Sequence, residues 1–231
     1  MLPPRSTSLT GPQLERRTRI LTAAGELATQ GGWDAVQMRE VAQIADVALG
    51  TLYRYFPSKE YLLVSMMIAE IEGLAHRLAV KPPQGEEPVD RVIDVLRRAN
   101  RALQRRPLAT IATIRALVSG NTEIAPAVKE TTELMRRIIS DALAVDGSDA
   151  EADFGAGDDS DAGTDVARSP ERVVVSEGGS VVESAAEGCY QVSIELLSDI
   201  WLAALIAWIT GVESDDSVLP KLEQATRVLF A

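Results

Sequence analysis

Two residue types on which many enzymes and metal sites depend are almost missing from this sequence. Its 231 residues include one histidine, His76, and one cysteine, Cys189. A single cysteine cannot form an internal disulfide and is typical of a reducing cytoplasm. One histidine is too few for a typical metal site or for histidine-based catalysis. We therefore expect no metal, no cofactor and no enzymatic activity.

Aromatic residues and long apolar runs are also scarce. Three Trp, four Tyr and three Phe accompany a hydrophobic content of 46%, which favours helices packed through Ala, Leu, Ile and Val. The longest apolar run, Ile200 to Ile209, is shorter than the roughly 20 residues that cross a bilayer. Residues 1–12 lack the apolar core of a signal peptide. The sequence thus predicts a cytoplasmic, all-α protein without a membrane segment.

Positive charge is scarce overall, but the imbalance is local. The formal net charge is −11, and residues 146–187 alone hold twelve Asp/Glu against two Arg. Residues 1–60 hold seven Lys/Arg against six Asp/Glu, so the charge does not exclude a nucleic-acid partner for that part. The acidic segment has one aromatic residue, Phe154, and its composition predicts disorder. A small hairpin around Gly178-Gly179, in "RVVVSEGGSVVE", is the alternative for its end.

Helical periodicity and Pro or Gly boundaries divide the chain into nine predicted helices. Residues 1–12 are expected to form a flexible arm, residues 13–57 a small N-terminal domain, and residues 58–231 a larger bundle that the acidic insert 146–187 interrupts. The predicted helices cover about residues 14–30, 38–45, 49–55, 58–79, 89–105, 108–119, 125–145, 190–210 and 218–230.

The stretch "DVALGTLYRYFPSKEYLL", residues 46–63, contains a three-residue turn after one short predicted helix and before another. This is the arrangement of a helix-turn-helix, whose second helix enters the major groove of DNA. In that helix Leu49, Leu52 and Phe56 share a face, which we expect to pack on the preceding helices. The lack of a side chain at Gly50 lets a DNA backbone come close. The faces left for a duplex carry Gly50, Thr51, Tyr53, Arg54 and Tyr55.

These side chains have the chemistry of a DNA contact. The hydroxyls of Thr51, Tyr53 and Tyr55 suit phosphate oxygens, which fix register without reading sequence. Arg54 can reach a guanine edge or a phosphate, and Lys59 adds a phosphate contact at the next helix start. The alternative is that the tyrosines belong to the core; residues two apart on a helix point about 200° apart, so both cannot.

The segment "AVQMREVAQIADVALGTLYRYFPSKEYLL" resembles the helix-turn-helix of TetR-type transcriptional regulators, in which "GTLY-x-x-F" followed by Lys is a specific signature. The stretches "VQMR", "LGTLYRYFPSK", "NRALQRRPL" and "SDIWLAALIAWIT" look closest to the actinobacterial repressors of steroid (cholesterol) catabolism, the KstR type. The resemblance covers about residues 14–145 and 188–231. It implies that Gln37 and Arg39 also approach DNA. The alternative for Arg39 is a solvent-exposed ion pair with nearby acidic side chains.

Three positions depart from the family pattern. Ala48-Leu49 stand where many relatives have Ser-Lys, which removes a cap hydroxyl and a phosphate-binding ammonium. Asp46 occupies a turn position that is often Gly, and Asp tolerates a left-handed backbone better than most residues. These departures leave open a second interpretation, in which the chain is a helical dimeric interaction protein that has lost specific DNA binding.

A homodimer on a palindromic operator of double-stranded DNA is expected, because one helix-turn-helix offers little reading surface. The segment "IELLSDIWLAALIAWITG" is apolar nearly all round and needs burial on both sides, and the last two helices form the dimer interface in TetR-type regulators. A single central core helix is the alternative. The residues expected at the interface are Trp201, Leu205, Trp208 and Ile209.

The resemblance further implies a small-molecule site inside the C-terminal bundle and an apolar effector, such as a steroid or a coenzyme A thioester. Methionines at helical spacing also suit plain core packing, and the arginine stripe around Arg101 also suits a solvated face. The candidate effector-binding residues are Met66, Met67, Ile111, Ile114, Leu117, Leu134, Ile138 and Arg101.

The function predicted from these features is a ligand-responsive transcriptional repressor, released from its operator by an apolar small molecule. An all-α enzyme is the other class to consider. The chain has no GxSxG, HExxH or P-loop motif, and the pair of Glu72 and His76 is explained by an i,i+4 contact on a helix surface. The enzyme interpretation therefore has no motif to support it.

Overall fold

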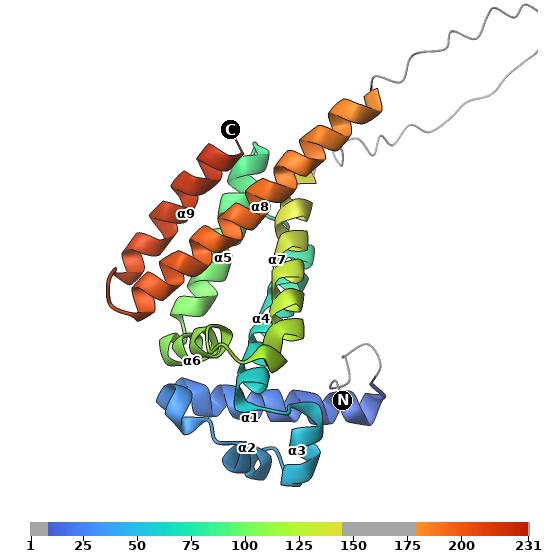
Figure 1. The fold of residues 1–231 in the computed structure, drawn as a ribbon, viewed down its shortest axis with the longest axis vertical. Helices are drawn as coiled ribbons and strands as arrows, with labels where there is room; N and C mark the ends of the chain where they lie inside the picture. The colour runs from blue at the N-terminus through green and yellow to red at the C-terminus, as the bar shows by residue number, and fades with distance from the viewer. Residues whose placement is uncertain (1–8, 145–178, 231) are drawn as a thin grey trace, which may run out of the picture.

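The computed structural model describes residues 9–144 and 179–230, and within these ranges it contains nine α-helices, one short 3-10 helix and no strand (Figure 1). The predicted all-α class is confirmed. The helices are α1 (Gly11–Ala35), α2 (Met38–Ile44), α3 (Leu49–Tyr55), α4 (Lys59–Val80), α5 (Pro88–Gln104), α6 (Pro107–Leu117), α7 (Ala125–Ala144), α8 (Gly179–Ile209) and α9 (Asp215–Leu229).

The first three helices form a small domain at one end of the molecule (Figure 1). Helix α1 lies across the base of the remaining helices, and α2 and α3 lie on its far side. Helix α4 leaves this domain and runs into a bundle with α5, α7, α8 and α9, while α6 packs against α1 and α4. The small domain is therefore joined to the bundle through α4 and α6.

Two apolar cores correspond to these two parts. The first joins α1, α2 and α3 to the beginning of α4 and to α6, with Ile20, Leu52 and Phe56 among its fully buried side chains. The second joins the rest of α4 to α5, α7, α8 and α9. Because α4 contributes Leu62 and Leu63 to the first core and Leu74 to the second, one continuous helix belongs to both.

Helix α1 is longer than predicted at both ends. It starts at Gly11, where the backbone N–H of Thr10 donates to Oε1 of Gln13 at 2.9 Å. The expected break at Gly31-Gly32 is present as a kink inside the helix, where Gly32 has a φ of 63°. This left-handed conformation favours glycine, since a Cβ would crowd the following carbonyl.

The predicted start of α4 is confirmed. The Oγ of Ser58 accepts a hydrogen bond from the backbone N–H of Tyr61 at 3.1 Å, which satisfies one of the free donors at the helix start. The described bounds of α3 match those predicted for the second helix of the motif.

Helix α8 begins at Gly179, well before residue 190 where it was predicted to start. Residues 179–187, which the sequence placed in the disordered insert, are therefore helical, and the second strand of the proposed hairpin is wrong. Extending an existing helix costs less than starting a new one, so a weakly helical segment can continue α8. The rest of the insert and most of the predicted arm lie outside the described residues.

Within α8, the segment Tyr190–Ile209 is long and apolar enough, by length and composition alone, to cross a membrane. Core helices of globular proteins meet the same criterion. Here α8 packs against α7 and α9, and Ile194, Leu197 and Trp201 are buried in the second core.

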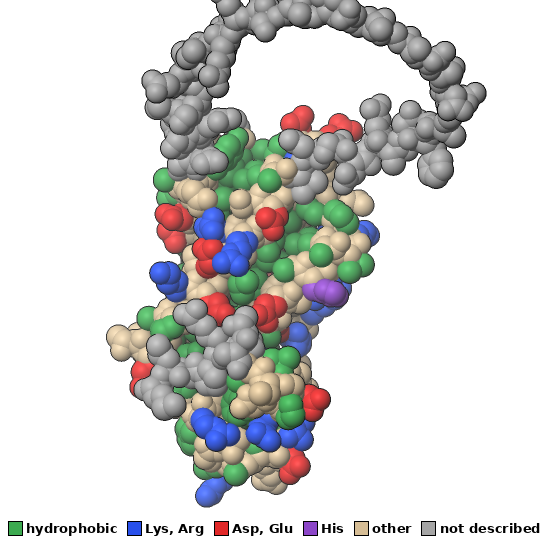
Figure 2. Space-filling model, turned by 90° about the vertical axis from the view of Figure 1, so that its right-hand side faces the viewer, with side chains coloured by type: hydrophobic (Ala, Val, Ile, Leu, Met, Phe, Trp, Pro, Cys, Tyr) green, Lys and Arg blue, Asp and Glu red, His purple; other side chains and the backbone are tan. Residues whose placement is uncertain are grey.

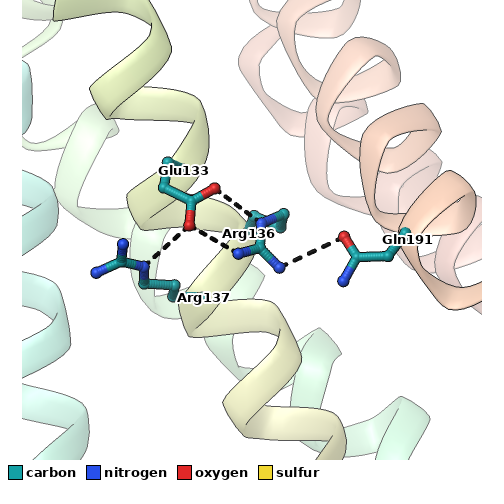
Figure 3. Close-up of polar contacts among 4 residues, drawn as sticks. All are labelled: Glu133, Arg136, Arg137 and Gln191. Carbon is teal, nitrogen blue, oxygen red and sulfur yellow. Dashed lines mark hydrogen bonds and ion pairs between the residues drawn. The ribbon is translucent and has the colours of Figure 1, made fainter. Parts of the chain in front are cut away.

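Polar side chains link α7 to α8 near their packed surfaces (Figure 3). The carboxylate of Glu133 accepts from Arg136, with Oε1 to Nη2 at 2.7 Å, and from Nε of Arg137 at 3.1 Å. Arg136 also donates through Nη1 to Oε1 of Gln191 on α8 at 3.4 Å. The hydrogen bonds from Arg136 and Arg137 lower the pKa of Glu133 to about 2.

Replacing Glu133 with Gln is expected to weaken the acid sensitivity of folding. A carboxylate with a lowered folded-state pKa stabilises the fold above its ordinary pKa of 4.5 and loses that contribution as the pH falls towards about 2. Urea unfolding at pH 6 and pH 3 should therefore show a smaller loss of stability for Glu133→Gln than for the parent chain. Glu130→Gln, a substitution on the same helix, is the control, and equal losses in Glu133→Gln and the parent would contradict the prediction.

Candidate DNA-binding surface and effector cavity

The turn between α2 and α3 has the geometry of a helix-turn-helix. Asp46 adopts a φ of 52°, the left-handed conformation predicted for this position. The N–H of Val47 donates back to the carbonyl of Ala42 at 3.0 Å, and the carbonyl of Ala48 accepts from Thr51 at 2.8 Å. No side chain caps the start of α3, as expected from Ala48 in place of Ser.

The inner face of α3 differs from the prediction at two positions. Tyr55 is only 4% exposed and packs with Leu52 and Phe56 in the first core, whereas Leu49 lies at the exposed edge. Tyr55 follows Leu52 by three residues, which places it about 60° away on the helix. The helix is therefore turned towards Tyr55, and the prediction that its side chain faces a duplex is wrong.

The outer face of this motif carries the other predicted DNA-contacting residues. Tyr53 is 46% exposed, and Arg54 and Gly50 are exposed beside it, with Thr51 half-buried. A Cβ at Gly50 would meet nothing within 4 Å, so the fold itself does not require glycine there. From the start of α2, Gln37 and Arg39 are also exposed.

Basic side chains gather over this end of the molecule, as Figure 2 shows. The guanidinium of Arg54 lies 6.0 Å from the ring centre of Tyr55, and that of Arg17 on α1 lies 5.8 Å from the ring of Phe56. The guanidinium of Arg54 therefore lies at cation–π distance from the buried ring of Tyr55, a contact that the sequence did not predict because Tyr55 was assigned to the outer face.

Lys59 joins α4 to the end of α1. Its ammonium donates to the backbone carbonyl of Trp33 and lies 4.3 Å from the centre of that indole ring, while Arg115 of α6 lies 4.7 Å from the same ring. Burial lowers the pKa of Lys59, Asp34 and Glu60 act in the opposite direction, and Arg115 lowers it further. The predicted phosphate contact of Lys59 stays a prediction.

A cavity of about 400 Å³ opens among α4, α5, α6, α7 and α8. Its wall is mainly apolar, and the polar residues lie on α4, α7 and α8. The apolar lining residues are Met67, Ile71, Leu74, Ala99, Ala102, Leu103, Ile114, Leu117, Met135, Trp201, Leu202 and Leu205. The polar ones are Glu70, Arg77, Thr131, Thr132, Glu195, Ser198 and Asp199.

Three of the eight predicted effector-binding residues line this cavity: Met67, Ile114 and Leu117. The prediction is wrong for the others as wall residues. Met66 is buried in the first core, because neighbours on a helix point about 100° apart and only one methionine can face the cavity. The remaining ones pack elsewhere or are exposed: Ile111, Leu134, Ile138 and Arg101.

The sequence did not identify Glu70 as part of the cavity, since it lies within the apolar stretch "SMMIAEIEGL". Its carboxylate pairs with Nη2 of Arg106 at 2.7 Å. Burial raises the pKa of Glu70, and the charges of Arg106 and Arg77 oppose this rise. The position of Glu70 on α4 links the cavity wall to the loop that joins α5 and α6.

The predicted interface residues of α8 also face inwards in part. Trp201 and Leu205 are buried and line the cavity, and Trp208 and Ile209 pack partly against the second core. The outward apolar face instead carries Val192, Leu196 and Ile200, one helical turn apart, with Tyr190 above them. An all-apolar helix gives no periodicity by which the two sides can be told apart.

Comparison with known proteins places these features in a family. Residues 20–66 match the family model described as bacterial regulatory proteins, tetR family, and residues 85–154 match a tetracyclin repressor-like C-terminal domain. The chain is 36% identical over 218 residues to the HTH-type transcriptional repressor KstR of Rhodococcus jostii. The aligned residues make up 94% of this chain and 84% of that protein. It is 34% identical over 218 residues to KstR of Mycobacterium tuberculosis, with 94% and 82% covered.

A solved structure agrees over nearly the whole length. A TetR transcriptional regulator from Rhodococcus sp. RHA1 has a TM-score of 0.72 and 29% identity, with 95% of this chain and 98% of that chain covered. The helix-turn-helix, the helical C-terminal bundle and these similarities agree, and the chain belongs to the tetR family of bacterial regulatory proteins, the DNA-binding regulators of transcription.

Proposed function

We propose that this chain is a cytoplasmic, homodimeric repressor that binds a palindromic operator through α3 and leaves it when an apolar small molecule fills the bundle cavity. The observation that carries the proposal is the course of α4. Its first residue, Lys59, holds the end of α1 at Trp33, and further along it Met67, Ile71 and Leu74 line the cavity. A change at the cavity wall can therefore reach the helix-turn-helix through one helix.

The DNA-contacting group in this proposal is the exposed set around α3. Arg54 is assigned to a base edge or a phosphate, and Tyr53 and Thr51 to phosphate oxygens, because hydroxyls and guanidinium groups make these contacts. Gly50 admits the DNA backbone, and Gln37 and Arg39 approach from the start of α2.

The effector in this proposal is a steroid or an acyl-coenzyme A-like metabolite, of which the apolar part enters the cavity. The cavity volume of about 400 Å³ falls within the range of small-molecule sites, about 300–1,000 Å³. The similarity to the KstR repressors supports this class of effector. Met67, Ile114 and Leu117 are the wall residues that we assign to it.

The dimer in this proposal forms through the outward face of α8. Val192, Leu196 and Ile200 leave a line of apolar side chains on a helix whose other side is already packed. Such an unpartnered face is typical of a protein–protein contact. The two subunits would then present their α3 helices to successive major grooves.

Release from DNA follows from a two-state equilibrium. A ligand changes the populations only by the difference in its affinity for the two states. A shift from 1% to 99% of the released state needs about 5.5 kcal/mol of such difference. The released state is the one in which the occupied cavity has displaced α4 from its operator-binding position.

Arg54→Ala is expected to weaken operator binding by about 1–3 kcal/mol, roughly 5- to 150-fold. Fluorescence anisotropy with a labelled duplex from the gene's own upstream region measures this, against a scrambled duplex of equal length and at two salt concentrations. Binding should be selective and should weaken with salt, since phosphate neutralisation releases counterions.

Arg105→Ala is the matched control, because Arg105 is an exposed arginine at the end of α5. It should leave the affinity unchanged. Equal or absent binding of the two duplexes would favour the alternative, a helical dimer that no longer binds DNA specifically. The same anisotropy titration, repeated with candidate effectors added, measures the release of the protein from the operator.

A further inference from the structure

The outward face of α3 begins with residues whose side chains cannot form hydrogen bonds. Ala48, Leu49 and Gly50 are consecutive and all exposed. The exposed side chains that can form hydrogen bonds, Tyr53 and Arg54, lie one turn further along the helix. In a helix-turn-helix the first residues of the second helix are those that contact base edges in the major groove. At these positions the chain therefore offers a base only apolar contact.

Leu49 is the one large apolar side chain of this group. It is 36% exposed, whereas Leu52 on the inner face of the same helix is fully buried. Residues four apart on a helix are neighbours on one face, so Leu49 lies beside the exposed Tyr53. Single exposed leucines are common on protein surfaces. What distinguishes Leu49 is its place on the outward face of the helix-turn-helix.

Gly50 gives an independent reason to expect a close approach at this place. Within a helix, glycine is less favourable than alanine. A Cβ at Gly50 would meet nothing within 4 Å, so packing inside the protein does not require glycine here. A glycine allows the backbone of another molecule to come near the helix. Such an approach would also bring the neighbouring Leu49 within reach of a base.

The major groove presents one apolar group to such a side chain, the C5 methyl of thymine. The other bases present hydrogen-bond donors and acceptors there. A leucine packed against those groups would displace their water without replacing the hydrogen bonds, which is costly. The side chain of Leu49 therefore favours a thymine and disfavours a G·C pair at the position it covers.

We propose that Leu49 recognises one thymine in each half of the operator through the C5 methyl group of that base. The proposal rests on the proposed function and deepens it, because it adds a base that the DNA-contacting surface selects. The departure from the family pattern at Ala48-Leu49 then replaces a contact with phosphate by a contact with a base. It does not amount to a loss of specific DNA binding.

The test removes one methyl group at a time from the DNA. Labelled duplexes are made from the gene's own upstream region, and in each one a single thymine is replaced by deoxyuridine, which keeps the base pairing and lacks only the C5 methyl. Fluorescence anisotropy with the full-length chain measures every affinity. We expect one such replacement in each half-site to weaken binding about fourfold, the factor for burying one methyl group, and the two together about 15-fold.

Three variants assign this effect to one side chain. Leu49→Ala should bring the affinity ratio of thymine to deoxyuridine at the sensitive position close to one. Leu49→Met keeps a long apolar side chain and should preserve the discrimination. Leu108→Ala is the matched control, because Leu108 is a leucine with 44% exposure on α6, outside the helix-turn-helix. It should leave the ratio unchanged, and circular dichroism checks that each variant is folded.

Equal affinities across the whole deoxyuridine series would overturn the proposal, as would a Leu49→Ala variant that remains sensitive at the same thymine. The proposed function is tested separately by the unmodified duplex against a scrambled one. A parent chain that binds these two equally would count against the repressor, and the contact of Leu49 would fall with it. Selective binding of the unmodified duplex together with an insensitive series would count against the contact of Leu49 alone.

Discussion

Replacing Ile200 with glutamate is expected to convert the dimer to monomers and to lower operator affinity by about 10²- to 10⁴-fold, the range lost when two linked sites bind separately. Ile200 is 36% exposed, between Leu196 on one side and Ala203 on the other along the outward face of α8. A buried, unpaired carboxylate at a subunit contact is strongly unfavourable. Sedimentation velocity measures the subunit state, and anisotropy with the operator measures the affinity.

Val80→Glu is the matched control, since Val80 is a more exposed apolar residue at the end of α4. It should leave both the subunit state and the affinity unchanged. Circular dichroism checks that the Ile200→Glu bundle is folded, which is expected because Ile194, Leu197 and Trp201 still fill its interior. An Ile200→Glu variant that remains dimeric would place the subunit contact on another surface.

Phe56→Ala is expected to destabilise the helix-turn-helix domain by about 3–5 kcal/mol, the range for deleting a buried Phe. Phe56 is 1% exposed at the end of α3, with the rings of Tyr55 and Tyr61 at 6.3 and 6.5 Å. Its loss leaves a cavity between α3 and the start of α4. Urea unfolding measures the change in stability, and amide hydrogen exchange shows whether the loss is concentrated in α1–α3.

Tyr53→Ala separates stability from DNA binding on the same helix. Tyr53 is exposed, so its truncation should change stability by less than about 0.5 kcal/mol while weakening operator binding. Phe56→Ala should reduce both. A small stability change in Phe56→Ala, or a large one in Tyr53→Ala, would contradict the inner and outer faces described for α3.

Local patterns in the sequence were sufficient to predict the helix-turn-helix. The bounds of α3, the cap at Ser58 and the left-handed turn at Asp46 all follow from residue types with a specific backbone preference. These features depend on neighbours within one or two turns, so they are visible without a structure. The fold class followed in the same way from periodicity and from Pro and Gly boundaries.

The sequence did not predict to better than one residue which side of a helix faces the core. Tyr53 and Tyr55 are both aromatic, and on the helix they lie on opposite sides of Leu52. Which of the two is buried depends on how α3 packs on α1 and α4. The same limit applies on α8, where Trp201 faces inwards and its neighbour Ile200 faces outwards. An apolar surface on all sides contains no signal for this choice.

The cavity wall was the least predictable part. Met67, Ile114 and Leu117 line it, but Met66 and Ile138 do not, and polar wall residues such as Glu70 have no signature within an apolar helix. A cavity depends on where five helices fail to fill the space between them. That is a property of tertiary packing, to which no short stretch of sequence corresponds.

The continuity of α4 has a consequence for the spacing of the two subunits in the proposed operator-bound dimer. At about 1.5 Å per residue, Leu74 at the cavity lies about 22 Å along the axis from Lys59 at the helix-turn-helix domain. A tilt of about 5° around the cavity end therefore moves the other end by about 2 Å. In a symmetric pair the two displacements add to about 4 Å, which exceeds the roughly 3.4 Å between successive base pairs. A rotation of this size is enough to put one subunit of the proposed dimer out of step with its half of the proposed operator by a whole base pair.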